Sequence, residues 1–149
     1  MRKDLGAKPY LFPQPVMIIG TYDENGKANA MNAAWGGIVG RNEIIIDLSN
    51  HKTTENLLET RAFTVSKFVN APVINELPLT LECVLTQVID GSKYLGEIKN
   101  VSIDEKILGE DGDIDLNKFV PITYDAAHYG YYRLGEKVGT AFKDGAQLK

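Results

Sequence analysis

The sequence predicts a mainly β fold, a small barrel with short helices, and three observations support this prediction. Short apolar and β-branched runs bounded by turn residues recur along the chain. Only one stretch has the pattern of a short helix, with a hydroxyl at its start and an acidic residue in its first turn. The glycine-rich loops of dinucleotide-binding sheets and of P-loop proteins are both absent from the sequence, which disfavours a doubly wound α/β sheet.

The N-terminal third contains three predicted strands. Residues 16–22 are apolar and β-branched, and the Asn25-Gly26 pair that follows suits a tight hairpin turn. Residues 28–35 are therefore expected to return as the second strand. Residues 43–48 form a nearly continuous apolar run, which predicts a third strand that is buried on both faces.

A short helix and three further strands are predicted next. Residues 53–60 have the helix pattern, and residues 62–66 return to strand. Residues 79–89 and 94–101 flank an Asp-Gly-Ser turn, so they are expected to pair as a second hairpin.

The C-terminal part is predicted to hold one more strand. Residues 124–134 are rich in tyrosine, which favours a strand, and residues 135–145 are expected to form a short helical or looped tail. Residues 105–116 are acidic and contain glycine. Leu116 and Ile122 stand where an EF-hand calcium loop requires its turn glycine and its bidentate glutamate, so a solvated acidic loop is expected rather than a metal site.

Size and composition predict one soluble domain that spans residues 1–149. A chain of 149 residues with 44% hydrophobic and 24% charged residues can bury a sizeable core. The formal net charge of -4 disfavours binding to nucleic acid or to an anionic membrane. No apolar run reaches the roughly 18 residues that cross a bilayer, and residues 10–20, which two prolines interrupt, are unlike a signal peptide.

The single cysteine, Cys83, favours a reducing compartment, and a cytoplasmic location is expected. One cysteine excludes an intramolecular disulfide and a cysteine-rich zinc site. Because Cys83 lies in an apolar run, we expect a buried structural thiol.

The most informative polar stretch, residues 48–56, lies where a buried strand meets the N-terminus of the helix. The first N–H groups of the helix, the positive end of its dipole, the hydroxyls of Ser49 and Thr53 and the ammonium of Lys52 could converge on one phosphate. A second interpretation stays open, in which Ser49 or Thr53 only caps the helix and Lys52 is solvated.

A second stretch, residues 29–37, combines small side chains with two amides and an indole. Small side chains let a flat ligand approach the backbone, whose N–H and C=O groups can pair with the polar edge of an aromatic ring. Gly36 and Gly37 beside Trp35 would form the rim of such a site and admit a second planar molecule. The alternative is that the small residues pack where barrel walls close and that Trp35 fills the core.

A set of short motifs runs in one order through nearly the whole chain. In the N-terminal half these are Lys8-Pro9, Pro13-Gln14-Pro15-Val16, Gly20-Thr21, residues 29–37, Leu48-Ser49 and His51-Lys52-Thr53 with Asn56. In the C-terminal half they are Phe68-Val69-Asn70-Ala71-Pro72, Glu76-Leu77-Pro78, Glu82-Cys83, Gly96-Glu97-Ile98 and Leu134-Gly135-Glu136-Lys137-Val138-Gly139 with Ala141-Phe142. Together they resemble the flavin reductase-like, FMN-binding split-barrel family, particularly its flavoredoxin-type members.

The resemblance implies a Greek-key split β-barrel that binds FMN. It places the FMN phosphate near Ser49, His51, Lys52 and Thr53, and the isoalloxazine ring along residues 31–34 and Leu48. The cofactor-binding residues that it implies are Met31, Asn32, Ala33, Ala34, Trp35, Leu48, Ser49, Asn50, His51, Lys52, Thr53 and Asn56. It also implies a homodimer whose second subunit helps to cover the flavin, with the region of His128 and Tyr129 contributing in trans.

The function that the resemblance implies is that of an FMN-dependent reductase. Electrons would pass from NAD(P)H or a small redox protein through FMN to an acceptor such as free flavin, a ferric chelate or a protein, without a catalytic acid or base. A non-catalytic flavin-binding redox carrier is an alternative, since no arginine cluster or dinucleotide fingerprint is visible for NADPH. An OB-like barrel that binds nucleic acid is a third reading, and the acidic charge argues against it.

The chain departs from the family at one place. In the family, several dozen residues lie between the strand that ends at Val65-Ser66 and the segment that begins at Phe68, and here these anchors are almost adjacent. The missing segment adds helix and loop over the barrel and forms part of one wall of the flavin pocket. Either the deletion is real, or residues between Ser66 and Phe68 are absent from this sequence. The second explanation is favoured, because a strand that leads directly into Asn-Ala-Pro leaves little room for a crossover connection.

Overall fold

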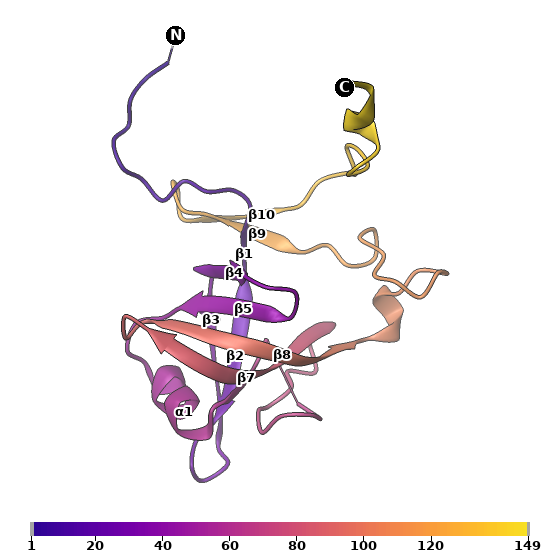
Figure 1. Cartoon of the computed structure of the whole chain (residues 1–149). Coiled ribbons are helices and arrows are strands. Elements are labelled where there is room, and N and C mark those ends of the chain that lie inside the picture. Colours follow the sequence, from indigo (N-terminus) through magenta and orange to yellow (C-terminus); the bar gives the residue numbers. More distant parts are fainter. Residues whose placement is uncertain (1, 149) are drawn as a thin grey trace.

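The computed structural model of the chain describes residues 2–148, which form two antiparallel sheets (Figure 1). The larger sheet curls into a half-barrel of seven strands in the order β3-β2-β6-β7-β8-β5-β4. Its strands are β2 (Met17–Tyr22), β3 (Ala28–Ala33), β4 (Gly36–Ile38), β5 (Glu43–Asp47), β6 (Ala62–Thr64), β7 (Leu79–Ile89) and β8 (Lys93–Ile103). The prediction of a mainly β split barrel is therefore confirmed.

The smaller sheet has three strands and lies over the end of the half-barrel that carries β4 and β5 (Figure 1). Its strands are β1 (Gln14–Pro15), β9 (Ile122–Asp125) and β10 (Gly130–Arg133), in the order β1-β9-β10. The prediction of one strand over residues 124–134 is wrong, because the chain reverses between β9 and β10. Asp125 Oδ1 accepts a hydrogen bond from Ala127 N at 2.8 Å, and Tyr129 takes a left-handed φ of 58°. These two features make the turn.

Both predicted hairpins are confirmed. β2 and β3 pair from Met17 opposite Ala33 to Tyr22 opposite Ala28. Their turn uses Gly26, whose φ of 76° is costly for residues with a Cβ. β7 and β8 pair along their length and join through Asp90 and Gly91, which have φ values of 52° and 73°. Positive φ at both central residues gives the turn a twist that matches its strands.

The helix α1 (Lys52–Thr60) begins one residue before the predicted start. His51 is its N-cap residue, and Thr54 Oγ1 accepts a hydrogen bond from His51 N at 2.8 Å. The Thr54 hydroxyl thus accepts from the backbone N–H of the N-cap residue, and the interpretation that Ser49 or Thr53 caps this helix is wrong. The helix ends at Arg61, whose φ of 55° lets its N–H bond Leu57 O.

The core of the half-barrel lies between the seven-stranded sheet and α1. Its largest fully buried apolar side chains are Ile19, Ile46, Leu57, Phe63, Leu85 and Tyr94. Burial of each such side chain contributes about 1.5–3 kcal/mol. Glycine is required at position 96, because a Cβ there would lie 2.5 Å from Phe63 Cζ.

Two predictions about buried strand residues have different outcomes. Cys83 is fully buried, and this burial together with the charge of Glu82 raises the pKa of its thiol to about 12, which confirms a structural thiol. The prediction that β5 is buried on both faces is wrong. Ile44 and Ile46 face the core and are buried, whereas Ile45 on the opposite face is only half-buried.

A buried carboxylate fixes the connection between β6 and β7, residues 65–78. Glu82 is 1% exposed, and its oxygens accept hydrogen bonds from Phe68 N at 2.6 Å and from Asn100 Nδ2 at 2.7 Å. Since β6 and β7 are antiparallel neighbours, their connection requires no crossover. The argument that the chain leaves too little room for a crossover after Ser66 therefore does not apply, because β6 and β7 are joined without one.

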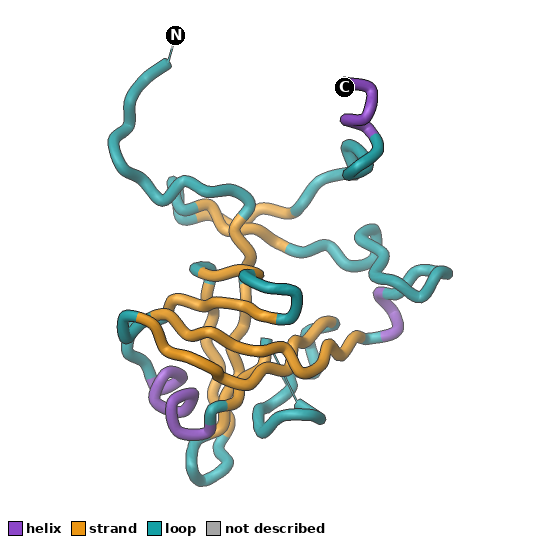
Figure 2. The backbone as a smooth tube through the Cα atoms, viewed as in Figure 1, coloured by secondary structure: helices purple, strands orange, loops and turns teal. Residues whose placement is uncertain are grey.

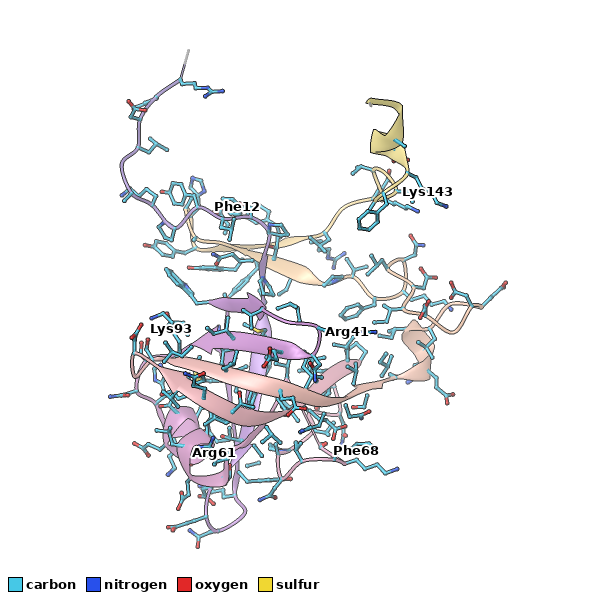
Figure 3. The ribbon with its side chains drawn as sticks, in the orientation of Figure 1. Phe12, Arg41, Arg61, Phe68, Lys93 and Lys143 are labelled. Carbon is cyan, nitrogen blue, oxygen red and sulfur yellow. The ribbon has the colours of Figure 1, made fainter. Side chains whose placement is uncertain are left out.

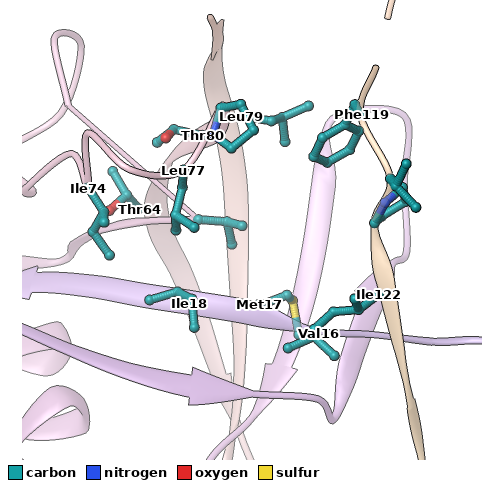
Figure 4. A pocket seen from close by; sticks show the side chains of 14 residues that line it. Val16, Met17, Ile18, Thr64, Ile74, Leu77, Leu79, Thr80, Phe119 and Ile122 are labelled. Carbon is teal, nitrogen blue, oxygen red and sulfur yellow. The ribbon is translucent and has the colours of Figure 1, made fainter. Parts of the chain in front are cut away.

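An apolar cavity of about 360 Å³ lies beside this connection (Figure 4). Its walls come from the start of β2, from residues 74–80 and from residues 119–122. Thr64 and Thr80 are its only polar side chains, and Thr64 Oγ1 donates to Pro72 O at 2.5 Å. None of the predicted site residues lines this cavity.

The remaining segments are loops, two short 3₁₀ helices and two arms (Figure 2). The acidic segment begins with η1 (Glu105–Ile107), which was not predicted, and continues as the predicted loop. The tail is looped up to η2 (Asp144–Leu148). Both chain ends extend away from the half-barrel, beyond the smaller sheet (Figure 1). Within residues 2–148, no helix has the length and apolar character that a membrane crossing requires.

Candidate functional site

A second cavity, of about 260 Å³, lies between the half-barrel and the smaller sheet. It opens where β3 ends, where β5 leads into α1 and where the β9–β10 hairpin crosses over both. We call it the Trp35 cavity, and its lining residues are Met31, Asn32, Ala33, Ala34, Trp35, Asp47, Leu48, Ser49, His51, Tyr124 and Tyr131. It therefore joins the two stretches that the sequence singled out.

Eight of the twelve predicted site residues line this cavity: Met31, Asn32, Ala33, Ala34, Trp35, Leu48, Ser49 and His51. Trp35 is 50% exposed at the mouth of the cavity, so the alternative that it fills the core is wrong. Asn50 and Lys52 are exposed beside the cavity, and Lys52 Nζ lies 3.4 Å from Glu55 Oε2. The exposed end of the cavity thus carries the start of α1.

The other two predicted residues, Thr53 and Asn56, face the interior. Thr53 is 1% exposed, and its Oγ1 accepts a hydrogen bond from Asn29 Nδ2 at 2.6 Å. Asn56 is fully buried, and its Nδ2 donates to Thr21 Oγ1 at 3.2 Å, while its Oδ1 has no hydrogen-bond partner among the described residues. These side chains hold α1 against the β2–β3 hairpin.

Three lining residues were not predicted from the sequence. Tyr124 and Tyr131 lie opposite each other on β9 and β10, with ring centroids 5.8 Å apart and an interplanar angle of 49°. Tyr131 Oη accepts a hydrogen bond from Asn32 Nδ2 at 3.3 Å, which ties the hairpin to β3 across the cavity. Asp47 is the third. The tyrosine-rich composition was a signal for the first two, but only a correctly placed turn brings both rings to one face.

The prediction that Gly36 and Gly37 form the rim of the site together with Trp35 is wrong. Gly36 and Gly37 belong to β4 and line no part of the Trp35 cavity. A Cβ on Gly36 would collide with the carbonyl oxygen of Ile45, whereas a Cβ on Gly37 would meet nothing within 4 Å. Gly36 is therefore required for the close pairing of β4 with β5, and Trp35 alone of the three residues forms the rim.

The two ends of the cavity differ in their chemistry. At the α1 end, the first backbone N–H groups of the helix have no partner within the helix, and Ser49 and Lys52 are exposed beside them. An anion is favoured here by the helix dipole and by these donors. At the β3 end, Ala33 and Ala34 leave room for a flat group between the strand and the tyrosines.

The size of the cavity fits part of a nucleotide. A volume of about 260 Å³ lies slightly below the roughly 300–1,000 Å³ that encloses whole small ligands. A flat ring would fill the enclosed part, and a charged tail would extend over the exposed residues at the α1 end. The donor set and the shape therefore fit FMN. Within residues 2–148, no group of three or more His, Cys, Asp or Glu residues is arranged to hold a metal ion.

His128 lies outside the cavity in the β9–β10 turn. Its Nδ1 lies 2.9 Å from Asp125 Oδ2, and its side chain is 80% exposed. This hydrogen bond, with that from Ala127 N, holds the pKa of Asp125 below its usual value. The pair stabilises the turn that carries Tyr124 and Tyr131.

Comparisons with known proteins give one kind of match. No protein-family model matches the chain, and no curated protein matches it significantly. Among solved structures, the chain is similar to the flavoredoxin of Desulfovibrio vulgaris (Miyazaki F), with 30% sequence identity, a TM-score of 0.92 and coverage of 97% of this chain and 100% of that chain.

Two further structures share the fold at lower identity. A flavoredoxin from Methanosarcina acetivorans is 21% identical, with a TM-score of 0.89 and full coverage of both chains (100% and 100%). A 2-nitrobenzoate 2-nitroreductase from Pseudomonas fluorescens is 18% identical, with a TM-score of 0.78 and coverage of 87% of this chain and 85% of that chain. From the shared fold and the 30% identity over almost its whole length, the chain belongs to the flavin reductase-like, FMN-binding split-barrel family, as a flavoredoxin-type member.

Proposed function

We propose that the chain binds FMN in the Trp35 cavity and acts as an FMN-dependent oxidoreductase. The observation that carries this proposal is that one cavity joins residues 31–35 to residues 47–51. These stretches supply a flat slot and an anion site, which are the two parts that a flavin mononucleotide requires. The similarity to proteins named flavoredoxins supports the same cofactor.

The phosphate would lie at the α1 end of the cavity. The Ser49 hydroxyl, the first N–H groups of α1 and the Lys52 ammonium would bind it, with Asn50 and His51 beside it. Thr53 would contribute its backbone N–H, because its hydroxyl already bonds Asn29. Asn56 would act by positioning the helix through Thr21.

The isoalloxazine ring would lie along Met31 to Ala34 and against Leu48. Tyr124 and Tyr131 would cover it from the smaller sheet, and Trp35 would border its open side. Bound FMN supplies the one-electron and two-electron chemistry, while these residues bind and orient it. The open mouth beside Trp35 is where a donor or an acceptor would approach.

NAD(P)H or a small redox protein would be the electron donor, and free flavin, a ferric chelate or a protein would be the acceptor. The shared fold with a nitroreductase supports an enzyme that reduces a separate acceptor. One observation favours the second candidate, a redox carrier between proteins. The lining of the Trp35 cavity includes no Lys or Arg, which leaves no evident partner for the 2′-phosphate of NADPH.

A homodimer is the assembly that we propose. The two arms carry large apolar side chains that residues 2–148 leave uncovered: Leu5, Tyr10, Leu11, Phe12, Leu134, Val138 and Phe142. Figure 3 shows Phe12 on the N-terminal arm and Lys143 on the C-terminal arm, both clear of the half-barrel. Exposed apolar surface of this extent indicates a protein interface. As the family resemblance implies, the second copy would also help to cover the flavin.

The proposed location is the cytoplasm. Cys83 is the single cysteine, and its burial and raised pKa make it inert, so nothing in the chain depends on an oxidising compartment.

The proposal is tested by the visible absorption spectrum of the purified protein after addition of FMN and desalting, followed by anaerobic addition of NADH or NADPH. Retained flavin bands are expected, because the phosphate end anchors the ligand. Bleaching by either nicotinamide supports the reductase, and bleaching only by dithionite or a reduced redox protein supports the carrier. Absence of retained flavin in repeated preparations would contradict FMN binding itself.

A further inference from the structure

Asp47, the last residue of β5, places an acidic side chain in the lining of the Trp35 cavity. Its backbone N–H donates to Trp35 O at 2.8 Å, which fixes the residue between the rim of the cavity and Leu48. The residue is half-buried. Within residues 2–148, its carboxylate makes no ion pair and no hydrogen bond with another side chain. Asp47 and His51 are the two lining residues that carry a carboxylate or an imidazole.

The nearest cross-strand cation does not neutralise this carboxylate. Lys93 is the register partner of Asp47 on β8, but its Nζ lies 3.3 Å from Asp90 Oδ2. The lining itself includes no Lys or Arg. A negative charge that is half-buried and unpaired acts on a neighbouring ligand more strongly than a fully solvated charge does.

This charge would also orient a bound ligand. A phosphate would be repelled by Asp47 and attracted by the N-terminus of α1, so the uncharged ring end of the ligand would take the place near Asp47. The ring would then lie close to a fixed negative charge.

We infer that Asp47 sets the balance between oxidised and reduced FMN in this site, an inference that rests on the proposed function. Two-electron reduction of FMN near neutral pH adds two electrons and one proton, so the bound ring gains one negative charge. The Asp47 carboxylate opposes that charge and leaves the uncharged oxidised ring unaffected. Asp47 therefore shifts binding toward oxidised FMN, and the bound cofactor is a stronger reductant than it is without Asp47.

The test compares Asp47→Asn with the wild type and with Glu43→Gln. Glu43 lies on the same face of β5 at its other end and outside the cavity, so its substitution makes the same change in net charge. The dissociation constants of FMN and of dithionite-reduced FMN are measured anaerobically for each protein. Asp47→Ser serves as a second neutral variant in case the asparagine alters the strand.

In Asp47→Asn, the preference for oxidised over reduced FMN is expected to fall by about tenfold, which corresponds to a rise of about 30 mV in the two-electron reduction potential. Glu43→Gln is expected to leave the ratio unchanged. Equal ratios in wild type, Asp47→Asn and Asp47→Ser, with FMN retained by all three, would overturn the inference and leave the proposed function standing. A wild-type protein that binds neither form of FMN would overturn both.

Discussion

Asn29 Nδ2 donates a hydrogen bond to Thr53 Oγ1 over 2.6 Å, and this bond joins β3 to the first turn of α1. The two residues belong to the two stretches from which the candidate site was inferred. Thr53 is 1% exposed, so the bond is shielded from water. It fixes the anion-binding end of the Trp35 cavity relative to the strand that forms its floor.

Thr53→Val is expected to weaken both the fold and the site. Valine keeps the shape but leaves the Asn29 amide without its acceptor, so the free energy of unfolding should fall by about 1–3 kcal/mol. FMN affinity should fall as well, because the start of α1 is less firmly positioned. Urea unfolding and FMN titration measure the two effects.

Thr86→Val is the matched control for this prediction. Thr86 Oγ1 donates to Leu95 O at 3.0 Å in an exposed position, and Thr86 does not line the Trp35 cavity. Its substitution should change stability only slightly and FMN affinity not at all. A Thr53→Val protein that is as stable as this control would show that the Asn29 bond contributes nothing.

Tyr131→Phe should speed the release of FMN without much effect on stability. The change removes the hydroxyl that accepts the 3.3 Å hydrogen bond from Asn32 Nδ2. This hydrogen bond is exposed and contributes about 0.5–1 kcal/mol. The hairpin is then less tightly held over the cavity, and the dissociation rate of FMN should rise a few-fold. Stopped-flow displacement measures this rate. Tyr132→Phe on the same strand, outside the lining, should leave it unchanged.

Glu82→Gln should destabilise the fold by about 1–3 kcal/mol. Both carboxylate oxygens of Glu82 accept hydrogen bonds, one from Phe68 N and one from Asn100 Nδ2, whereas glutamine replaces one oxygen with an NH₂ group that cannot accept. Burial raises the pKa of Glu82, but the hydrogen bonds that its carboxylate accepts, chiefly from Asn100 Nδ2 and Phe68 N, outweigh burial and lower the pKa from its usual value of 4.5.

The lowered pKa fixes the sign of the pH dependence. The stabilisation by Glu82 is present above the pKa of the unfolded state and is lost as the pH falls through the lower pKa of the folded state. The stability difference between wild type and Glu82→Gln should therefore be constant near neutral pH and shrink below pH 4.5. Urea unfolding at a series of pH values measures it. A difference that grows on acidification would contradict this assignment.

Gly36 and Gly37 should differ sharply in their tolerance of alanine. A Cβ at Gly36 meets the Ile45 carbonyl oxygen and lies 3.2 Å from Ile46 Cα, so Gly36→Ala should cost about 1–3 kcal/mol by forcing β4 from β5. Gly37→Ala has open space and should be neutral or slightly stabilising. Thermal unfolding of the two variants measures the contrast. Equal melting temperatures would contradict the close pairing at Gly36.

Much of the fold could be predicted because local signals decide it. Gly26 and the Asp90-Gly91 pair supply the positive φ values that their hairpins require, and the hydroxyl of Thr54 in the first turn of α1 accepts from the N–H of the N-cap residue His51. The β9–β10 turn lacks such a signal. It depends on the Asp125 side chain and a left-handed Tyr129, and neither is evident in a tyrosine-rich run.

The candidate site was predictable to a similar extent. Residues that line the cavity because they lie at or just after the end of a strand, such as Ala33 and Ser49, follow from the local pattern. The inward orientation of Thr53 and Asn56 depends on partners at Asn29 and Thr21, which are distant in sequence. Asp47 could not be recognised, because a polar residue at the end of an apolar strand has no local feature that marks it as part of a cavity.

Trp35 is the single tryptophan of the chain and stands at the mouth of the cavity, so its fluorescence reports directly on occupancy. The most direct test of the central claim is a titration of this fluorescence with FMN and, separately, with riboflavin, for the wild type and Lys52→Ala. We expect saturable quenching by FMN, weaker binding of riboflavin, and a loss of about 1 kcal/mol of FMN affinity in Lys52→Ala, because Lys52 is exposed and already paired with Glu55. Unquenched Trp35 at saturating FMN, or equal affinity for FMN and riboflavin in both proteins, would contradict the placement of FMN and its phosphate in this cavity.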